Sequence, residues 1–288
     1  MIGHMYLPLT IISCHKAVKN RLAARSGALI PGFCDNRTGQ NGIDFVLTDE
    51  RNAERWLSGA LAWLEGFDGN PAIAFLSGAR APGYQPLLAC ISEAERVSAG
   101  TISVESDRLH FVLRRAFQRS FVAKLTGWQG PLSGIALTSA RDRRPECVDA
   151  PGLCLAFSST GLTLMAGAWR GGFIGVDIER LRPVSQAEEL ARRFFLQTEI
   201  DHLAGFSGAA LDAEFLRLWT IKEACLKAIG KGLDFGIQAF RVCPDGKNYR
   251  VEPPPAFGPS GRWSVTSLAA PEGCLASIVH CGADKQPS

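Results

Sequence analysis

The sequence predicts an α+β protein built from two related halves. Short β-type runs and amphipathic helical segments recur in a similar order over residues 73–172 and again over 173–281. The length of 288 residues and a hydrophobic content of 46% allow a large core. We divide the chain into an N-terminal extension left without a fold assignment (1–70), an N-terminal half (71–172), a C-terminal half (173–282) and a tail (283–288).

In the N-terminal half, each expected element follows from its hydrophobic period. Apolar residues at helical spacing from Ala53 to Leu64 predict a helix over 49–67, whereas residues 1 to about 45 show no clear period. The runs AIAFLSG and PLLACIS predict short strands, and SDRLHFVLRRAFQRSFVAKL predicts a second helix. LCLAFSS, LTLMAGAW and FIGVDIE predict three strands, the last of which opens the C-terminal half.

The C-terminal half continues with two expected helices, SQAEELARRFFLQTEIDHLAGF and LWTIKEACLKAIGKGL, and ends in β-runs with a hairpin signal at PDGK. In the second of these helices, Lys222 falls in the middle of the apolar arc that includes Phe215, Leu218 and Leu226. A lysine on an apolar stripe indicates that this helix does more than pack.

Composition and charge narrow the possible functions. A formal net charge of +3 gives no argument for nucleic-acid binding, although it suits a polyanionic small ligand or an acidic partner. The nine cysteines form no CxxC pair, which favours reduced thiols in a cytoplasmic protein. No apolar run approaches the ~20 residues that a membrane-spanning helix needs. Because no acidic residue precedes Asp35, a transit peptide remains an alternative interpretation of the start of the chain.

The strand that ends in GVDIE carries two carboxylates with the same orientation. Side chains alternate along a strand, so Asp177 and Glu179 share one face while Val176 and Ile178 share the other. Paired carboxylates suit Mg²⁺, which completes its shell with phosphate oxygens and water. With Glu223 as a third carboxylate, and with Lys222 and Lys227 close to it in sequence, the set predicts transfer of a phosphate-linked group.

The helix over residues 106–125 carries a basic stripe. Arg108, Arg115 and Arg119 are seven and eleven residues apart, which places them on one side of a helix. Two interpretations remain: a solvated helix face, or a stripe that faces the phosphates of a ligand.

Several of these motifs resemble one known family. FIGVDIE, ARRFFLQTE and LWTIKEACLKAIGKGL follow one another in the order and at the spacing of the 4'-phosphopantetheinyl transferases of the surfactin-synthetase-activating type (group II). Upstream, ISEAER, RRAFQR and RRP before a strand are also similar to that family. The resemblance covers roughly residues 73–281 and is strongest from Gly175 to Leu233.

The resemblance implies two pseudosymmetric halves, each a small, mostly antiparallel sheet packed with a long helix, with coenzyme A in the cleft between them. It implies that Asp177, Glu179 and Glu223 hold Mg²⁺, that Glu223 takes the proton of a carrier-protein serine, and that Lys227 neutralises charge on the leaving group. It further implies that Lys222 contacts phosphate, and that the serine attacks the β-phosphate and releases adenosine 3',5'-bisphosphate.

Other positions take their roles from the same resemblance. Arg143, Arg144 and Pro145 stand where the family has a Gly-Lys-Pro-like turn that meets coenzyme phosphates, although a solvated basic loop is the alternative. Trp219 is expected to pack, and Glu199 is either a site residue or a surface charge. Ser158 and Ser159 lie in a run where the family has Ser-His-Ser, so a serine stands where the histidine expected at the 3'-phosphate would be. We expect Arg143, Arg144 or the stripe that includes Arg108 and Arg115 to compensate.

The leading interpretation is therefore an active, monomeric transferase that modifies an acyl or peptidyl carrier protein of fatty-acid, polyketide or nonribosomal peptide synthesis. One alternative is a non-catalytic homologue that binds coenzyme A or a carrier protein, which the missing histidine alone favours. A magnesium-dependent phosphohydrolase, based on Asp177 and Glu179 alone, does not explain the remaining motifs.

Overall fold

The first half is built around an antiparallel sheet. The structure, a computed structural model, describes residues 53–54, 57, 61–64, 71–77, 83–138 and 144–282. In the first sheet the strand order is β1-β2-β6-β5, and every neighbouring pair is antiparallel. The strands are β1 (Leu61–Leu64), β2 (Ala72–Ser77), β5 (Cys154–Thr160) and β6 (Thr163–Trp169).

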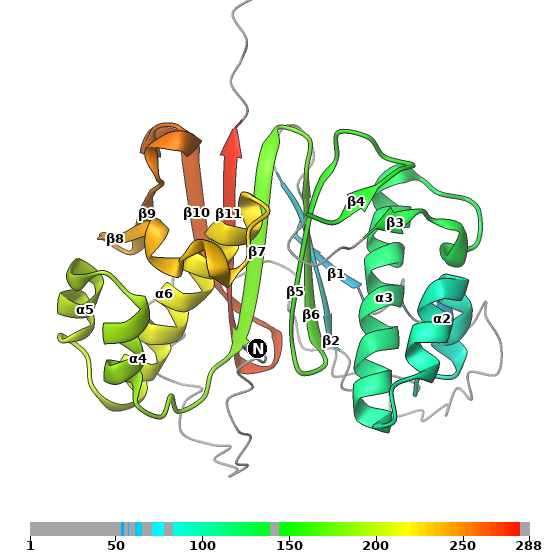
Figure 1. The fold of residues 1–288 in the computed structure, drawn as a ribbon, viewed down its shortest axis with the longest axis horizontal. Coiled ribbons are helices and arrows are strands. Elements are labelled where there is room, and N and C mark those ends of the chain that lie inside the picture. The colour runs from blue at the N-terminus through cyan, green and yellow to red at the C-terminus, as the bar shows by residue number, and fades with distance from the viewer. Residues whose placement is uncertain are drawn as a thin grey trace, which may run out of the picture. The chain divides into compact units, whose positions relative to one another are not determined.

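Helices cover one face of this sheet, as Figure 1 shows for the half that contains α2 and α3. Ser92 begins α2 (Glu93–Gly100) with a capping box in which the Ser92 side chain accepts from the Glu95 amide and the Glu95 carboxylate accepts from the Ser92 amide. The long helix α3 (Glu105–Thr126) ends at Gly127, whose φ of 67° is the left-handed conformation typical of a helix end. Short elements complete this half: η2 (Pro86–Cys90), η3 (Leu132–Gly134), β3 (Leu137–Thr138) and β4 (Glu146–Cys147).

The second half repeats the combination of an antiparallel sheet and one long helix. Its strand order is β10-β11-β7, formed by β7 (Gly172–Arg180), β10 (Trp263–Ala270) and β11 (Cys274–Gly282). Helix α6 (Gly208–Ala228) packs on β7 and β11. Both halves belong to one compact unit, Phe45–Ser288. The predicted α+β class with two similar halves is confirmed.

Smaller elements cover the other side of α6. They are α4 (Ala187–Phe194), α5 (Gln197–Leu203), η4 (Leu233–Phe235), η5 (Ile237–Ala239), and the hairpin of β8 (Arg241–Asp245) and β9 (Asn248–Glu252). Around β10 lie η6 (Pro255–Phe257), η7 (Ser260–Arg262) and η8 (Pro271–Gly273). Helix α6 is therefore enclosed between a sheet and these elements, and its buried residues lie on more than one side.

Among the described residues, three apolar cores hold these layers together. One lies between the first sheet and α3, and another surrounds α6. The third joins the two sheets: Ile73, Phe75 and Met165 of the first sheet pack with Val176 and Ile178 of β7. Burying so much apolar surface between the halves is the main force that holds β5 next to β7.

Three element predictions were wrong in detail. The helix expected over 49–67 does not reach Phe67, because Leu61–Leu64 pairs with β2 as strand β1; a short apolar run has no period that separates strand from helix. The expected strand PLLACIS is the 3₁₀ helix η2, since Pro86 sits in its first turn. The helix expected over 185–206 is broken into α4 and α5 by extended backbone at Phe195 and Leu196.

The predicted boundary at residue 71 also needs correction. Strand β1 belongs to the first sheet, and Ala53 and Leu57 are buried in the same core as α3. The first half therefore begins before residue 71. The rest of the expected extension, and the tail at 283–288, lie outside the described residues. Within the described ranges, no helix combines the length and the apolar character that crossing a membrane requires.

Candidate active site

The site forms on the α6 side of β7. Alternation along β7 turns Val176 and Ile178 into the core between the sheets, and turns Asp177 toward α6, where Lys227 contacts it. This is the arrangement that the GVDIE pattern predicted. Asp177 is buried, with 5% of its surface exposed, while Glu179 at the end of the strand is partly exposed.

A glycine lets the helix approach the strand closely. At Gly175, a β-carbon would lie 1.8 Å from the backbone oxygen of Ala224 and 2.6 Å from the backbone nitrogen of Ala228. These distances leave no space for any side chain, so only glycine permits this contact. The contact sets α6 against β7 at the level where Glu223 and Lys227 face the strand.

Lys227, Asp177 and Ser158 form one hydrogen-bonded group that joins the two halves. The Lys227 ammonium lies 2.6 Å from Asp177 Oδ1 and 3.0 Å from Ser158 Oγ. The Ser158 hydroxyl donates to the same Asp177 oxygen at 2.7 Å. Strand β5 of the first half, and β7 and α6 of the second, therefore each supply one polar side chain to the group.

Carboxylates crowd this position. Burial, together with the Asp177 carboxylate, raises the pKa of both Glu179 and Glu223 to about 7. Burial opposes the charge of Lys227, but Asp177 and Glu223 outweigh it and raise the pKa of the ammonium. Three ionised carboxylates and one ammonium would leave two negative charges in excess. The site therefore has the electrostatic balance that a divalent cation would complete.

One carboxylate oxygen at the site lacks a partner. Asp177 Oδ2 is buried and makes no hydrogen bond, in contrast to Oδ1. A buried anionic oxygen without a partner is costly, and such atoms often mark the position of an ion or ligand. In the part of the chain that is described, however, no three carboxylate, imidazole or thiol groups already converge as metal ligands.

Lys222 does not belong to this group, and the prediction that it contacts a phosphate was wrong. Its side chain is fully buried, and its ammonium lies 2.9 Å from Glu199 Oε1. It also donates to the carbonyl oxygens of Ile237 at 3.2 Å and Phe240 at 2.7 Å. Because α6 is covered on both sides, the apolar arc around Lys222 faces α5 and β8, whereas Glu223 and Lys227 face β7.

Glu199 is neither a site residue nor a surface charge. It is 1% exposed; besides Lys222 it accepts from the backbone amides of Leu196 at 2.8 Å and Val242 at 2.7 Å. Trp219 packs as expected: the centre of its ring lies 5.7 Å from the ring centre of Phe194 and 6.2 Å from that of Phe215.

The arginine stripe of α3 is occupied by partners within the protein. Arg108 donates to the carbonyl of Ile102 and to the Tyr84 hydroxyl. Arg115 and Arg119 both pair with Glu95, at 3.4 Å and 2.7 Å, and Arg119 is only 2% exposed. Neither sequence interpretation fits: the stripe is not a solvated face, and its guanidinium groups already tie α3 to α2 and the segments around it.

Arg144 connects the loop before β4 with the second half. Its guanidinium lies 4.1 Å from the centre of the Phe173 ring, and its side chain fills the space beside Gly230, where a β-carbon would lie 2.9 Å from it. The Arg144 Nε is buried without a hydrogen-bond partner. Pro145 next to it is partly buried, and Arg143 lies outside the described residues.

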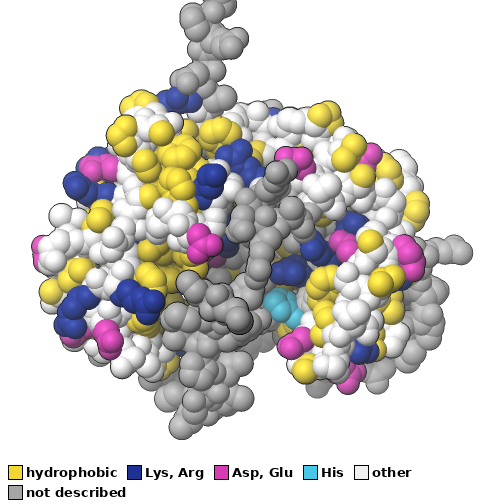
Figure 2. Space-filling model, viewed as in Figure 1, with side chains coloured by type: hydrophobic (Ala, Val, Ile, Leu, Met, Phe, Trp, Pro, Cys, Tyr) yellow, Lys and Arg dark blue, Asp and Glu magenta, His cyan; other side chains and the backbone are white. Residues whose placement is uncertain are grey.

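Sequence reasoning missed His110. Its Nε2 lies 3.3 Å from Ser159 Oγ, across 49 residues of sequence. Burial, followed by the nearby charge of Arg114, lowers the pKa of His110, while Asp107 opposes this shift. No sequence pattern around His110 or Ser159 indicates this contact. In Figure 2, lysine and arginine side chains gather near the middle of the viewed face, and a histidine is visible next to one of these groups.

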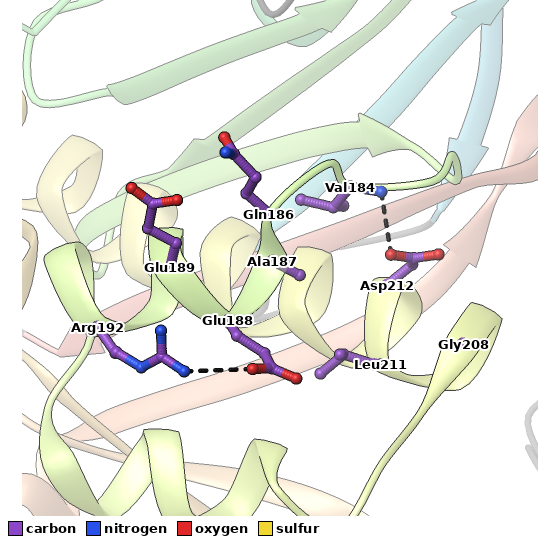
Figure 3. Close-up of a pocket in the computed structure, with 9 residues that line it drawn as sticks. All are labelled: Val184, Gln186, Ala187, Glu188, Glu189, Arg192, Gly208, Leu211 and Asp212. Carbon is purple, nitrogen blue, oxygen red and sulfur yellow. Dashed lines mark hydrogen bonds and ion pairs between the residues drawn. The ribbon is translucent and has the colours of Figure 1, made fainter.

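A separate hollow lies between the start of α4 and the first turn of α6. It has a volume of about 370 Å³ and contains the hydrogen bond from the Val184 amide to Asp212 and the ion pair of Arg192 with Glu188 (Figure 3). None of the site residues predicted from the sequence lines it. We therefore do not assign the chemistry to this hollow.

Comparison with known proteins places the chain in a family. The sequence model that describes the 4'-phosphopantetheinyl transferase superfamily matches residues 173–268. A Synechocystis protein, slr0495, whose name assigns it provisionally to these transferases, is 31% identical over 65% of this chain and 74% of its own length. The chain belongs to the 4'-phosphopantetheinyl transferase superfamily.

Other members of the superfamily are similar over shorter or comparable spans. The transferase HetI of Nostoc is 34% identical over 40% of this chain and 46% of its own length. The transferase Sfp of Bacillus subtilis is 28% identical over 59% of this chain and 74% of its own length. The range that matches the superfamily runs from β7 to β10 and contains Asp177, Glu223 and Lys227, whereas His110 and Ser159 lie before it.

Proposed function

We propose that this protein transfers the 4'-phosphopantetheine group of coenzyme A to a serine hydroxyl of an acyl or peptidyl carrier protein, and that it is of the surfactin-synthetase-activating type. The observation that carries this proposal is the group of Asp177, Lys227 and Ser158 at the junction of the halves, with Glu223 one helical turn before Lys227. An ammonium beside crowded carboxylates suits a reaction at a pyrophosphate.

The carboxylates fit Mg²⁺. Asp177 Oδ2 is buried without a partner, and burial together with the Asp177 carboxylate raises the pKa of Glu179 and Glu223 to about 7. All three residues supply the hard oxygen atoms that Mg²⁺ prefers. Asp177, Glu179 and Glu223 would hold the ion. When bound, the ion would offset the charge of the pyrophosphate and hold it for in-line attack.

The side chains supply the proton transfer and further charge. Glu223, with a pKa of about 7, can accept the proton of the carrier serine near neutral pH, directly or through a water molecule. The serine oxygen then forms a bond to the β-phosphorus, and the bond from this phosphorus to the bridging oxygen breaks. Lys227 stabilises the charge on the departing phosphate, and adenosine 3',5'-bisphosphate leaves.

Lys227 provides a sharp test. Lys227→Met keeps the length of the side chain but removes the charge next to Asp177, and should lower kcat roughly 100- to 1000-fold. Lys231→Met removes an exposed lysine four residues further along and serves as the matched control. The measurement is the release of adenosine 3',5'-bisphosphate from coenzyme A in the presence of an apo carrier protein and Mg²⁺. Equal rates for the two variants would remove Lys227 from the mechanism.

A further inference from the structure

Strand β5 presents its two neighbouring serines to different surroundings. Side chains alternate, so Leu155 and Phe157 face the core against α3, while Ala156 faces the core between the sheets. Ser158 continues the second face and meets Asp177 and Lys227. Ser159 continues the first face and meets His110 of α3.

The two serines therefore mark two separate polar positions, one residue apart along the strand. The first carries the carboxylates and Lys227. The second carries an imidazole and a hydroxyl, with the positive charge of Arg114 near enough to act on His110. Imidazole, hydroxyl and guanidinium groups together suit a phosphate, and this position would not attract a metal cation.

Coenzyme A carries phosphate at two separate places. Its pyrophosphate joins the pantetheine arm to the 5' carbon of the ribose, and a single phosphate is attached to the 3' oxygen of the same ribose. If the pyrophosphate occupies the position of Asp177 and Lys227, the 3'-phosphate needs a second group of donors a short distance away. The position at Ser159 is adjacent along β5.

Other arginines near α3 are committed elsewhere. Arg108 is bound to Ile102 and Tyr84, and Arg115 and Arg119 are bound to Glu95. Using them would break contacts that join α3 to α2 and to the segments around it. Among the described residues, His110 in contrast hydrogen-bonds to the neutral hydroxyl of Ser159, and this hydroxyl can turn to donate to a ligand.

We propose that His110 and Ser159 together bind the 3'-phosphate of coenzyme A, an inference that rests on the proposed function. The imidazole comes from α3 and adds a second donor to the hydroxyl that β5 carries at Ser159. On this account His110 is a binding residue for the coenzyme and takes no part in the bond-making step.

The test compares coenzyme A with 3'-dephospho-coenzyme A by isothermal titration calorimetry on the full-length protein with Mg²⁺. His110→Ala should weaken binding of coenzyme A roughly tenfold or more, the usual worth of a charge-assisted hydrogen bond. It should leave the affinity for 3'-dephospho-coenzyme A unchanged. The matched control is His280→Ala. His280 is a half-buried histidine of β11 that packs against Trp169, and its replacement should not alter the ratio of the two affinities.

A second variant guards against a folding defect. His110→Gln can still hydrogen-bond to Ser159 but cannot become positively charged. It should therefore keep the thermal stability of the wild type and still lower the ratio of the affinity for coenzyme A to that for 3'-dephospho-coenzyme A. An equal loss of affinity for both ligands, or no loss for either, would overturn the proposal. So would a change of the ratio by Arg144→Ala and not by His110→Ala, which would assign the 3'-phosphate to Arg144.

The proposed function can fail separately. If the wild type modifies an apo carrier protein but His110→Ala leaves the ratio unchanged, the role of His110 is wrong and the transferase activity stands. If the wild type binds no coenzyme A, both proposals fall together.

Discussion

The ammonium of Lys222 lies 2.9 Å from Glu199 in the core, while the next residue, Glu223, faces another side of α6, toward Asp177 of β7. Adjacent positions on an α-helix are 100° apart, so two neighbours can serve two different sides of a helix that is covered on both. The charge of Lys222 holds α5 against α6 through Glu199, whereas the charge of Glu223 belongs to the candidate active site.

Breaking the buried pair should destabilise the protein strongly. Lys222→Met leaves Glu199 buried without its counter-charge, which typically costs about 3–5 kcal/mol of unfolding free energy. The double variant Lys222→Met with Glu199→Gln removes both charges and keeps a carbonyl oxygen for the Val242 amide, so it should be more stable than the single variant. Urea denaturation monitored by tryptophan fluorescence measures both. A double variant that is less stable than Lys222→Met would contradict this account.

Gly175 should tolerate no side chain. Gly175→Ala would force α6 away from β7, since the new methyl group meets the backbone at Ala224, and overpacking of this kind costs about 1–3 kcal/mol or more. The variant should also lose turnover, because Lys227 moves away from Asp177. Gly261→Ala is the control, as a β-carbon there has no atom within 4 Å. Thermal denaturation and turnover that match the wild type would show that the helix contact is not needed.

Glu223→Gln should separate binding from chemistry. The substitution keeps the size of the side chain and removes its charge, so the fold and much of the coenzyme binding should persist. Turnover should fall roughly 100- to 10,000-fold if Glu223 takes the proton of the serine. The measurement pairs calorimetric binding of coenzyme A with the rate of carrier modification. Normal turnover in this variant would remove Glu223 from the mechanism.

The crowded carboxylates predict how stability depends on pH. The folded-state pKa values of Glu179 and Glu223 are about 7, above the ordinary value of 4.5, so the folded protein binds more protons than the unfolded chain between these values. The unfolding free energy should therefore fall as pH rises from about 5 to about 8, and Mg²⁺ should restore it more at the higher pH. Urea denaturation of the wild type and of Glu223→Gln measures this, and identical pH slopes would contradict it.

Much of the site could be predicted because it depends on local geometry. Period-two alternation places Asp177 and Glu179 on one face of β7 whatever the rest of the fold does, and the structure confirms that Val176 and Ile178 pack on the other face. Trp219 was likewise expected to pack. These features require only the strand and the helix on which the residues lie.

The contacts that could not be predicted depend on which elements cover one another. A helical projection places Lys222 on an arc, but it cannot say that α5 and η5 cover that arc and supply Glu199 and the carbonyl of Ile237. The contact of His110 with Ser159 requires α3 to cross β5 at one particular level, which no local pattern in either segment records. Similarly, Leu61–Leu64 forms a strand because it pairs with the edge of β2.

The most direct test of the central claim is the intact mass of an apo carrier protein after incubation with this protein, coenzyme A and Mg²⁺, with an EDTA control. The account predicts that the carrier gains the mass of one phosphopantetheine group, and that EDTA abolishes the gain. No gain on fatty-acid, polyketide or peptidyl carriers, while coenzyme A still binds, would contradict it and favour a protein that binds coenzyme A without transferring the arm.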